Sequence, residues 1–558
     1  MKRTYDHMDA KLFRSIGYED EDFKRPMIGI ANSFSEGIPG HINLRQLAEE
    51  VKRGIYRAGG NAIEFGVVAC CDGIGNSHDG GAYILPSREV IADSIEVKVK
   101  THRLDGIVLM GSCDKIVPGM LMGAARVNIP AILVPGGPMF AGPSFGNKKK
   151  TDSTAVMEAI AAYQIGKVDK QEVDNLEVTA FPTCGSCAFY GTANAMSCSA
   201  EALGMTMPNG GCAPAVYAER IRVARRTGEQ IIELVENDIK ARDIINYKSI
   251  QNAIAYLMAS SGSTNAVLHY AAIAHECGID VEEIIREFDR QSDIVPQIAT
   301  MIPACYDHDM VDFFHSGGVM RVMENIKEFL NLDVMTATGK TLGENMAAHN
   351  YPYGPAIETC ITTVDKPFAP MGSLTIMRGN LAPDSGVAKP SAIAEESRVF
   401  TGEAICFDGH DACMKALQER IVKPGHVVVV RYEGPKGGPG MREMLFPLKV
   451  IDGQGMARTT AMITDGRFAG ANSGCFVGHI SPEAAEGGPI ALVEDGDQIT
   501  IDVYKKEITL HVDEKELARR KAKWQYTPKV LDGYLARYAA LARSADKGGV
   551  LDYRKVLK

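Results

Sequence analysis

Cys113, Asp114 and Lys115 place a thiol, a carboxylate and an amine side by side, directly after an apolar run at 107–110. A thiolate is a ligand for iron or zinc, whereas a carboxylate is a ligand for magnesium or calcium. A protonated amine binds no metal, and its simplest role is to neutralise the neighbouring Asp114. The segment is therefore either a metal-binding site or an ordinary turn after a strand.

Cys71 and Asp72 form a similar pair at the end of the apolar run 63–70. Asp72 and Asp114 can share one magnesium ion, because Mg²⁺ prefers oxygen ligands and keeps water molecules that a substrate can displace. Each aspartate has an alternative role as a helix N-cap or turn residue. For Asp72 alone the turn is favoured, because Gly73 follows it.

The segment 182–187 contains one Cys-x-x-Cys motif, formed by Cys184 and Cys187. Such a pair fits half a zinc site, a thioredoxin-like redox pair or the ligands of an iron–sulfur cluster. The sequence has no second pair at zinc-finger spacing, which weakens the zinc interpretation, and two small residues in a tight turn remain the alternative. Cys113 as a third thiolate would favour a cluster.

Two loops of the C-terminal half have a composition typical of binding sites. The segment 431–444 holds four glycines and two prolines after an apolar strand, which lets the backbone approach a ligand closely, but it lacks the spacing of a dinucleotide or Walker loop. In the second loop, at 464–470, Arg467 can bind a carboxylate or pair with Asp465.

Alternating strands and helices predict a parallel α/β sheet in the first part of the chain. The expected strands are 27–34, 63–70, 106–110 and 131–135, with helices after Asn43 as N-cap and from about Pro86. Ligands of such sheets bind beyond the carboxyl ends of the strands, which is where Cys71-Asp72 and Cys113-Asp114-Lys115 lie. Residues 150–360 are expected to be mainly helical.

Short β-rich runs separated by turns begin after Lys366 and predict a β-rich barrel or sandwich. We expect an α/β domain over 1–365 and a barrel-like domain over 366–558 that closes the site. The expected strands include 427–430, 459–463, 490–493, 499–503 and 508–512, with a last helix over about 528–545.

Composition narrows the class of partner. Sixty Lys and Arg against 70 Asp and Glu give a net charge of −10, which argues against nucleic acid and an anionic membrane as partners and favours a small molecule. The thirteen cysteines are an odd number in a long chain, so a disulfide framework is not expected. The polar N-terminus and the lack of a long apolar span predict a cytoplasmic protein.

The motifs together resemble the dihydroxy-acid dehydratase family, which also contains phosphogluconate and sugar-acid dehydratases. The likeness covers almost the whole chain. It rests on motifs at 71–74, 85–89, 113–119, 184–187, 432–441 and 481–484.

The resemblance implies a homodimer that carries an iron–sulfur cluster and Mg²⁺. Its motifs make Cys113 and Cys187 cluster ligands, with Cys184 as the third and Cys71 as its rival. Some relatives add a cysteine near Gly40, which this chain lacks, so [2Fe–2S] and [4Fe–4S] both stay open. The residues that match the Mg²⁺ ligands are Asp72, Asp114, Glu443 and Lys115, the last through carbamylation of its amine.

One departure from the family concerns the catalytic base. The family has a serine, thought to act as an alkoxide, where this chain has Ala469, and Ser473 is a weak substitute. The resemblance implies dehydration of 2,3-dihydroxyisovalerate and 2,3-dihydroxy-3-methylvalerate to 2-keto acids in valine and isoleucine synthesis. A sugar-acid dehydratase, or a cluster-bearing protein with impaired turnover, remains the alternative.

Overall fold

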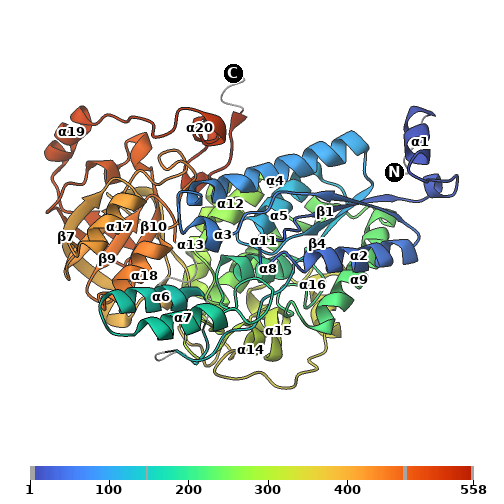
Figure 1. The fold of residues 1–558 in the computed structure, drawn as a ribbon, viewed down its shortest axis with the longest axis horizontal. Helices are drawn as coiled ribbons and strands as arrows, with labels where there is room; N and C mark the ends of the chain where they lie inside the picture. Colours follow the sequence, from blue (N-terminus) through green and yellow to red (C-terminus); the bar gives the residue numbers. More distant parts are fainter. Residues whose placement is uncertain (1–6, 146–148, 152, 469–473, 554–558) are drawn as a thin grey trace.

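Parallel strands form a sheet in the first part of the chain, in the order β2-β1-β3-β4 (Figure 1). The computed structural model describes residues 7–145, 149–151, 153–468 and 474–553. Every residue of β1, β3 and β4 is buried, as expected for apolar strands covered on both faces. The strands are β1 (Met27–Asn32), β2 (Asn61–Gly66), β3 (Gly106–Met110) and β4 (Ala131–Val134).

Helices cover both faces of this sheet (Figure 1). On one face α2 (Leu44–Arg57) packs against α9 (Ala218–Glu236), and on the other α4 (Gly81–His102) packs against α5 (Ile116–Val127). Buried apolar residues recur along α2 at Leu44, Leu47, Val51 and Ile55, which is the spacing of one helical face.

The loops after the strands meet at the carboxyl edge of the sheet. Ser33, after β1, donates through its hydroxyl to the carbonyl oxygen of Met110 at the end of β3 (2.6 Å). Asn43 donates through Nδ2 to the carbonyl oxygen of Gly136 after β4 (2.9 Å). Asn43 precedes α2 as predicted, but its side chain makes no N-cap hydrogen bond. Asn43 thus occupies the predicted N-cap position, but its side-chain amide joins two loops instead of capping the helix.

The region between β4 and the barrel is mainly helical, as predicted. Most of its helices pack beside the sheet, whereas the helices over 153–164 and 170–179 lie next to the barrel (Figure 1). The short helices α1 and α3 come earlier in the chain. Their bounds are α1 (His7–Arg14), α3 (Asp72–Gly75), α6 (Ser153–Gln164), α7 (Lys170–Thr179), α8 (Thr192–Ala202), α10 (Ala241–Ile244), α11 (Tyr247–Ala259), α12 (Asn265–Cys277), α13 (Val281–Ile294), α14 (Met310–His315), α15 (Gly318–Asn325) and α16 (Leu342–Ala348).

A closed barrel with the order β10-β6-β5-β12-β11-β7-β8-β9 follows, drawn in orange and red in Figure 1. Neighbours among β7, β8, β9 and β10 are parallel, and the other pairs except β5–β12 are antiparallel. The strands are β5 (Thr375–Gly379), β6 (Ala382–Ala388), β7 (Val399–Phe407), β8 (His426–Val430), β9 (Ala461–Thr464), β10 (Cys475–Ser481), β11 (Gln498–Asp502) and β12 (Glu507–Leu510).

Strand β8 contains an unbroken run of four valines, because both of its faces are buried. Val427 and Val429 belong to the core inside the barrel, whereas Val428 and Val430 pack with an outer layer. That layer includes α17 (His410–Gln418) and α18 (Leu445–Gly453), so both faces of the strand are buried. Helices α19 (Glu514–Lys523) and α20 (Gly533–Leu541) follow the barrel.

Several predicted elements differ from the observed ones. The strand expected over 63–70 ends at Gly66, because its neighbour β1 ends at Asn32 and offers no partner beyond it. Residues 490–493 form a 3₁₀ turn over Pro489–Leu492 in place of a strand, since Pro489 begins the turn. The helix expected over 528–545 spans only Gly533–Leu541, and Ala542 then pairs with Leu551.

Helix α4 begins at Gly81, ahead of the expected start near Pro86, which lies inside it. Proline has no N–H, so it cannot donate to the carbonyl of Ala82 four residues earlier. The backbone of Gly440 approaches that oxygen so closely that a Cβ on Gly440 would lie 1.9 Å from it. The proline thus leaves a place where the barrel's glycine-rich loop packs against α4.

The fold class predicted from the sequence is confirmed: a parallel α/β sheet with helical additions is followed by a closed β-barrel. The division into domains at residue 365 stays a prediction. Within the described residues, no helix has the length and apolar character needed to cross a membrane.

Candidate metal site

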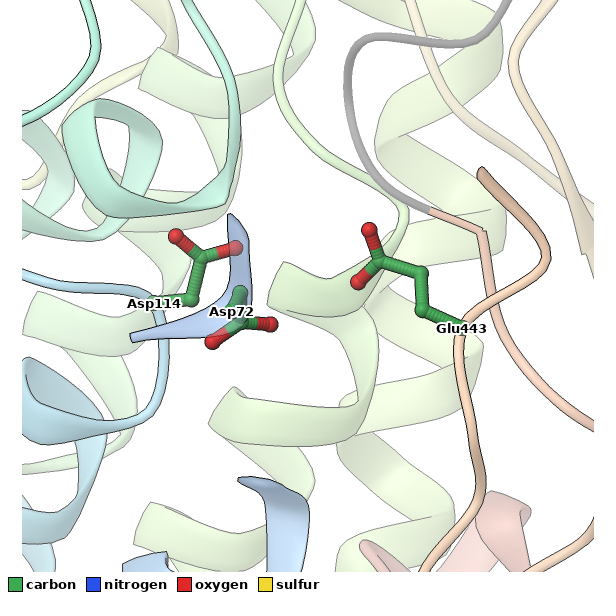
Figure 2. A group of neighbouring side chains, drawn as sticks. All are labelled: Asp72, Asp114 and Glu443. Carbon is green, nitrogen blue, oxygen red and sulfur yellow. The ribbon is translucent and has the colours of Figure 1, made fainter. Parts of the chain in front are cut away.

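Asp72, Asp114 and Glu443 bring their carboxylates together although they come from three different loops. Their candidate ligand oxygens all lie within 4.8 Å of one another. Figure 2 shows Asp72 and Asp114 on one side and Glu443 reaching toward them from a loop of the barrel. Asp72 begins α3, Asp114 follows β3, and Glu443 lies in the loop between β8 and α18. The carboxylates predicted as magnesium ligands thus meet in space.

Two buried cations lie among these carboxylates. Lys115 Nζ is 2.9 Å from Asp72 Oδ2 and 3.7 Å from Asp114 Oδ2. Arg467 contacts Glu443, and its Nη2 lies 3.4 Å from Asp72 Oδ2. Arg467 contacts the carboxylates of Glu443 and Asp72 and not that of Asp465, whose side chain accepts backbone N–H groups. Binding of a ligand's carboxylate by Arg467 stays a prediction.

The cluster combines three carboxyl groups with two cations. Burial and the neighbouring charge of Asp72 raise the pKa of Asp114 to about 7, although the charge of Lys115 lowers it. Burial likewise raises the pKa of Glu443, against the opposing charge of Arg467. Asp72 Oδ1 is buried without a hydrogen-bond partner among the described residues. Three oxygen donors with an unmet acceptor are what a hard divalent cation requires.

The candidate thiolates lie next to the carboxylates. A hydrogen bond with the Cys113 thiol lowers the pKa of Cys71, and backbone N–H groups of Ile74 and Gly73 add to this. The same hydrogen bond raises the pKa of Cys113, together with burial and the charges of Cys71, Asp114 and Cys187. Cys71 and Cys113 are therefore in contact, and the charge of Cys187 acts on Cys113. The choice between Cys184 and Cys71 as the third cluster ligand stays a prediction.

Cys187 is held by the start of α8. Asn194 Nδ2 donates to the carbonyl oxygen of Cys187 (2.5 Å), and Ser186 N donates to the carbonyl oxygen of Gly137 after β4 (2.9 Å). A Cβ added to Gly40 would lie 3.1 Å from Cys113 Sγ. The loop at Gly40, where some relatives have a cysteine, therefore borders the thiols.

His41 orients the Cys113 loop, a role that the sequence did not reveal. Its Nδ1 donates to the carbonyl oxygen of Ser33 (2.7 Å), and its Nε2 accepts from the backbone N–H of Cys113 (3.1 Å) and Ser112 (3.3 Å). Burial lowers the pKa of His41 to about 4, so the imidazole is neutral at pH 7. The only signal in the sequence was a histidine beside Gly40.

Asp465 orients the barrel loops, and it too was missed. Its carboxylate accepts from the backbone N–H of Glu433 (2.9 Å), Tyr432 (3.1 Å) and Ala484 (2.8 Å). Met444 N then donates to the carbonyl oxygen of Arg467 (2.8 Å), which joins the two loops at Glu443. From the sequence, Asp465 was recognisable only as an aspartate in a turn, and this does not indicate which backbone N–H groups its carboxylate binds.

The predictions for Ala469 and Ser473 concern positions outside the described residues. Phe468, just before them, accepts a hydrogen bond at its carbonyl oxygen from Thr264 Oγ1 (3.0 Å) ahead of α12. The replacement of the family's serine therefore rests on sequence alone.

The chain is similar to curated proteins over nearly all of its length. A dihydroxy-acid dehydratase of Pyrococcus furiosus is 49% identical, with 97% of each chain covered. One from Acetivibrio thermocellus is 47% identical with the same coverage. One from Methanosarcina barkeri is 44% identical, with 98% of each chain covered.

Two family models match consecutive parts of the chain. The N-terminal model of dihydroxy-acid/6-phosphogluconate dehydratases matches residues 25–345, and the C-terminal model matches residues 359–549. Together they span the sheet, the helical region and the barrel. This chain, whose carboxylate cluster draws on both matched parts, belongs to the dihydroxy-acid/6-phosphogluconate dehydratase family of hydro-lyases.

Proposed function

We propose that this protein dehydrates a 2,3-dihydroxy carboxylic acid to a 2-keto acid. The proposed substrates are 2,3-dihydroxyisovalerate and 2,3-dihydroxy-3-methylvalerate, as in valine and isoleucine synthesis. The observation that carries the proposal is the convergence of Asp72, Asp114 and Glu443 next to neighbouring thiols. The relatives' name, dihydroxy-acid dehydratase, supports the substrate class.

The residues fit the two cofactors of the proposal. Asp72, Asp114 and Glu443 would hold Mg²⁺, because they supply hard oxygen donors and an unmet buried acceptor at Asp72 Oδ1. Cys113, Cys187 and Cys71 would hold an iron–sulfur cluster, with Cys184 as the rival for the third position. Cluster ligands are thiolates, which cysteine side chains supply on losing a proton.

Dehydration requires loss of a weakly acidic proton from C2 and departure of hydroxide from C3. When bound, Mg²⁺ and a cluster iron would supply Lewis acidity for the C2 oxygen and for the leaving hydroxide. The protein's own part is to bury the reacting groups and to fix their surroundings. Arg467 and Glu443 are 0% and 2% exposed, so charges at this point are poorly screened by water.

Lys115 is proposed to react with carbon dioxide. The ammonium group first loses one proton; the amine nitrogen then forms a bond to the carbon of CO₂ as one C=O π bond breaks, and a second proton leaves the nitrogen. An anionic carbamate thus replaces a cation. As an ammonium group, Lys115 lies 2.9 Å from Asp72 Oδ2 and would repel a divalent cation there. Intact mass under bicarbonate, compared with Lys115→Arg, tests this step.

The decisive experiment is anaerobic purification and cluster reconstitution, followed by measurement of keto-acid release. The panel contains the two branched dihydroxy acids, gluconate and 6-phosphogluconate, with Glu443→Gln as an inactive control. Turnover of the branched acids supports the proposal. Turnover of sugar acids alone would overturn the substrate assignment, and a colourless, iron-free protein would refute the cluster.

Ala469 favours a second candidate, a cluster-bearing protein with impaired turnover. An alanine side chain offers no atom that accepts a proton, so the family's alkoxide is missing. The same assay on Ala469→Ser separates the candidates. A low rate that rises with serine supports impaired turnover, whereas an equal or lower rate shows that another group removes the proton.

The proposal extends to the state of the protein in the cell. We propose a homodimer in the cytoplasm, with domains that meet near residue 365. None of the thirteen cysteines, all of which lie in the described part of the chain, forms a disulfide, which suits a reducing compartment. Light scattering of the holoenzyme tests the dimer.

A further inference from the structure

His269 on α12 contacts Arg88, and this contact decides which of its ring nitrogens carries the proton. Arg88 Nη1 lies 3.2 Å from His269 Nδ1. A guanidinium group only donates hydrogen bonds, so Nδ1 must accept. Burial, together with the charges of Lys115, Arg88 and Arg467, lowers the pKa of His269, which keeps the ring neutral. The single ring proton is therefore on Nε2.

Arg88 is fixed in place, so this tautomer is fixed too. The Arg88 side chain is 0% exposed. Its Nη2 donates to Glu89 Oε1 (2.8 Å) and to the carbonyl oxygen of Gly548 (2.7 Å). With Nη2 held in this way, Nη1 is directed at His269. Nδ1 of the imidazole therefore remains the acceptor and Nε2 remains the donor.

The Nε2–H of His269 has no hydrogen-bond partner among the described residues. The side chain is 0% exposed, so solvent does not satisfy the group either. An unmet buried donor costs about 1–3 kcal/mol. Such donors are rare in native proteins, and a bound ligand, ion or water molecule usually accounts for them.

A contact on α12 links the position of His269 to the carboxylate cluster. His269 is one turn after Asn265 on the same face of α12. With its amide oriented to satisfy its partners, Asn265 accepts from Arg467 Nη1 (3.3 Å) and donates to the carbonyl oxygen of Phe468 (3.1 Å). The charges of Lys115 and Arg467 both act on His269.

A second histidine with the same property comes from the barrel. His479 is 2% exposed, and its Nε2 also has no hydrogen-bond partner within the described part of the chain. Its φ of 55° is left-handed, at an irregularity in the pairing of β10 with β6. Such bulges re-aim side chains next to active sites. His479 N donates to the carbonyl oxygen of Gly466, next to Arg467 (2.8 Å).

We propose that the Nε2–H of His269 donates a hydrogen bond to an oxygen of the hydroxy-acid substrate bound at the carboxylate cluster, and that Arg88 is the positioning residue that fixes this donor. His479 completes the polar wall on the barrel side. This inference rests on the proposed function, which it deepens by assigning a substrate-binding group.

Two substitutions separate a substrate contact from a structural one. His269→Asn keeps an acceptor near the position of Nδ1 for Arg88 and removes the outer donor. His269→Gln puts an amide N–H near the position of Nε2 and gives up the acceptor for Arg88. A substrate contact predicts that kcat/KM falls roughly ten- to a hundredfold in the Asn variant and clearly less in the Gln variant, which keeps the donor but loses its fixed orientation.

The kinetics are measured on reconstituted holoenzyme with 2,3-dihydroxyisovalerate, with iron content and thermal midpoint recorded for each variant. The opposite order, with Gln impaired and Asn normal, would show that His269 serves only Arg88 and would overturn the inference. Unchanged kinetics in both variants would overturn it as well. Tyr270→Phe is the control, because this buried neighbour lies toward Ser199 and should keep full activity.

A readout independent of turnover is the nitrogen spectrum of the protein labelled with ¹⁵N in histidine. The signal that disappears in His269→Asn should be that of the neutral Nε2–H form, and a neutral Nδ1–H form or an imidazolium would refute the assignment. A wild-type enzyme inactive on the whole acid panel would refute the proposed function and this inference together. An active wild type with a fully active Asn variant would refute this inference alone.

Discussion

Arg467 Nη2 lies 3.4 Å from Asp72 Oδ2, which joins the end of β9 in the barrel to the start of α3 beside the sheet. The same guanidinium contacts Glu443, and its Nε donates to the carbonyl oxygen of Met441 (2.8 Å). Arg467 thus binds both parts of the site at once, at a point where it is 0% exposed.

Replacing Arg467 by Met should destabilise the fold strongly. The substitution leaves Asp72 and Glu443 buried without their guanidinium partner, which typically costs about 3–5 kcal/mol. Urea unfolding of the purified chain measures the loss. Arg458→Met is the matched control, because its pair with Glu396 is exposed and should be worth less than about 1 kcal/mol. Equal effects of the two substitutions would contradict the role of Arg467.

Single cysteine substitutions should identify the cluster ligands. We expect Cys71→Ser, Cys113→Ser and Cys187→Ser to lose most iron after anaerobic reconstitution, because each removes a thiolate from the same group of neighbours. Cys184→Ser should retain iron and visible absorption, and so should the buried control Cys413→Ala. Loss of iron in Cys184→Ser with retention in Cys71→Ser would reverse the assignment of the third ligand.

Gly440→Ala should lower the free energy of unfolding by more than the strain of a positive φ alone. Gly440 has a φ of +90°, and an added Cβ would lie 1.9 Å from the carbonyl oxygen of Ala82. Gly496 has nearly the same φ, +89°, with nothing within 4 Å of an added Cβ, so Gly496→Ala measures the backbone penalty alone. The difference in unfolding free energy should exceed about 1 kcal/mol. Similar losses would mean that the loop and α4 separate at little cost.

The contribution of Glu483 to the free energy of unfolding should decrease as the pH rises. Burial raises the pKa of its carboxyl from 4.5 to about 8, and the side chain accepts from the backbone N–H of Lys436 (3.0 Å) and Gly437 (2.8 Å). Between these two values the folded chain binds more protons than the unfolded chain. This group's contribution therefore decreases with increasing pH, by at most about 1.4 kcal/mol per unit.

Urea unfolding at several pH values tests this, with Glu483→Gln as the variant that cannot ionise. Its stability should fall less steeply than that of the wild type across the interval. The exposed pair of Glu36 with Arg45 provides the control Glu36→Gln, which should follow the wild type. Parallel curves for wild type and Glu483→Gln would refute the assignment.

The sequence was most informative where a local pattern has a physical cause. Cys113-Asp114-Lys115 was expected at the edge of a parallel sheet, because loops after parallel strands converge there, and Asp72 was expected to meet it. The apolar run at 427–430 indicated a strand, because an unbroken run of valines is typical of a strand that is buried on both faces. These inferences need only neighbouring residues.

Contacts between distant segments could not be found in this way. Asp72 and Arg467 are 395 positions apart, and the residues around either one do not indicate that the two side chains meet. The run at 490–493 is too short for periodicity to separate a strand from a 3₁₀ turn. His41 and Asp465 act on backbone N–H groups, whose partners depend on loop paths that side-chain types do not specify.

The carboxylates of Asp72, Asp114 and Glu443 have a consequence for assembly. A cation that needs all three has a binding site only while the barrel loop remains docked on the sheet. By mass action, such a ligand favours the docked chain over every opened form, by an amount that grows with the logarithm of its concentration. Cofactor supply would thus set how tightly the protein stays closed, as well as how fast it works.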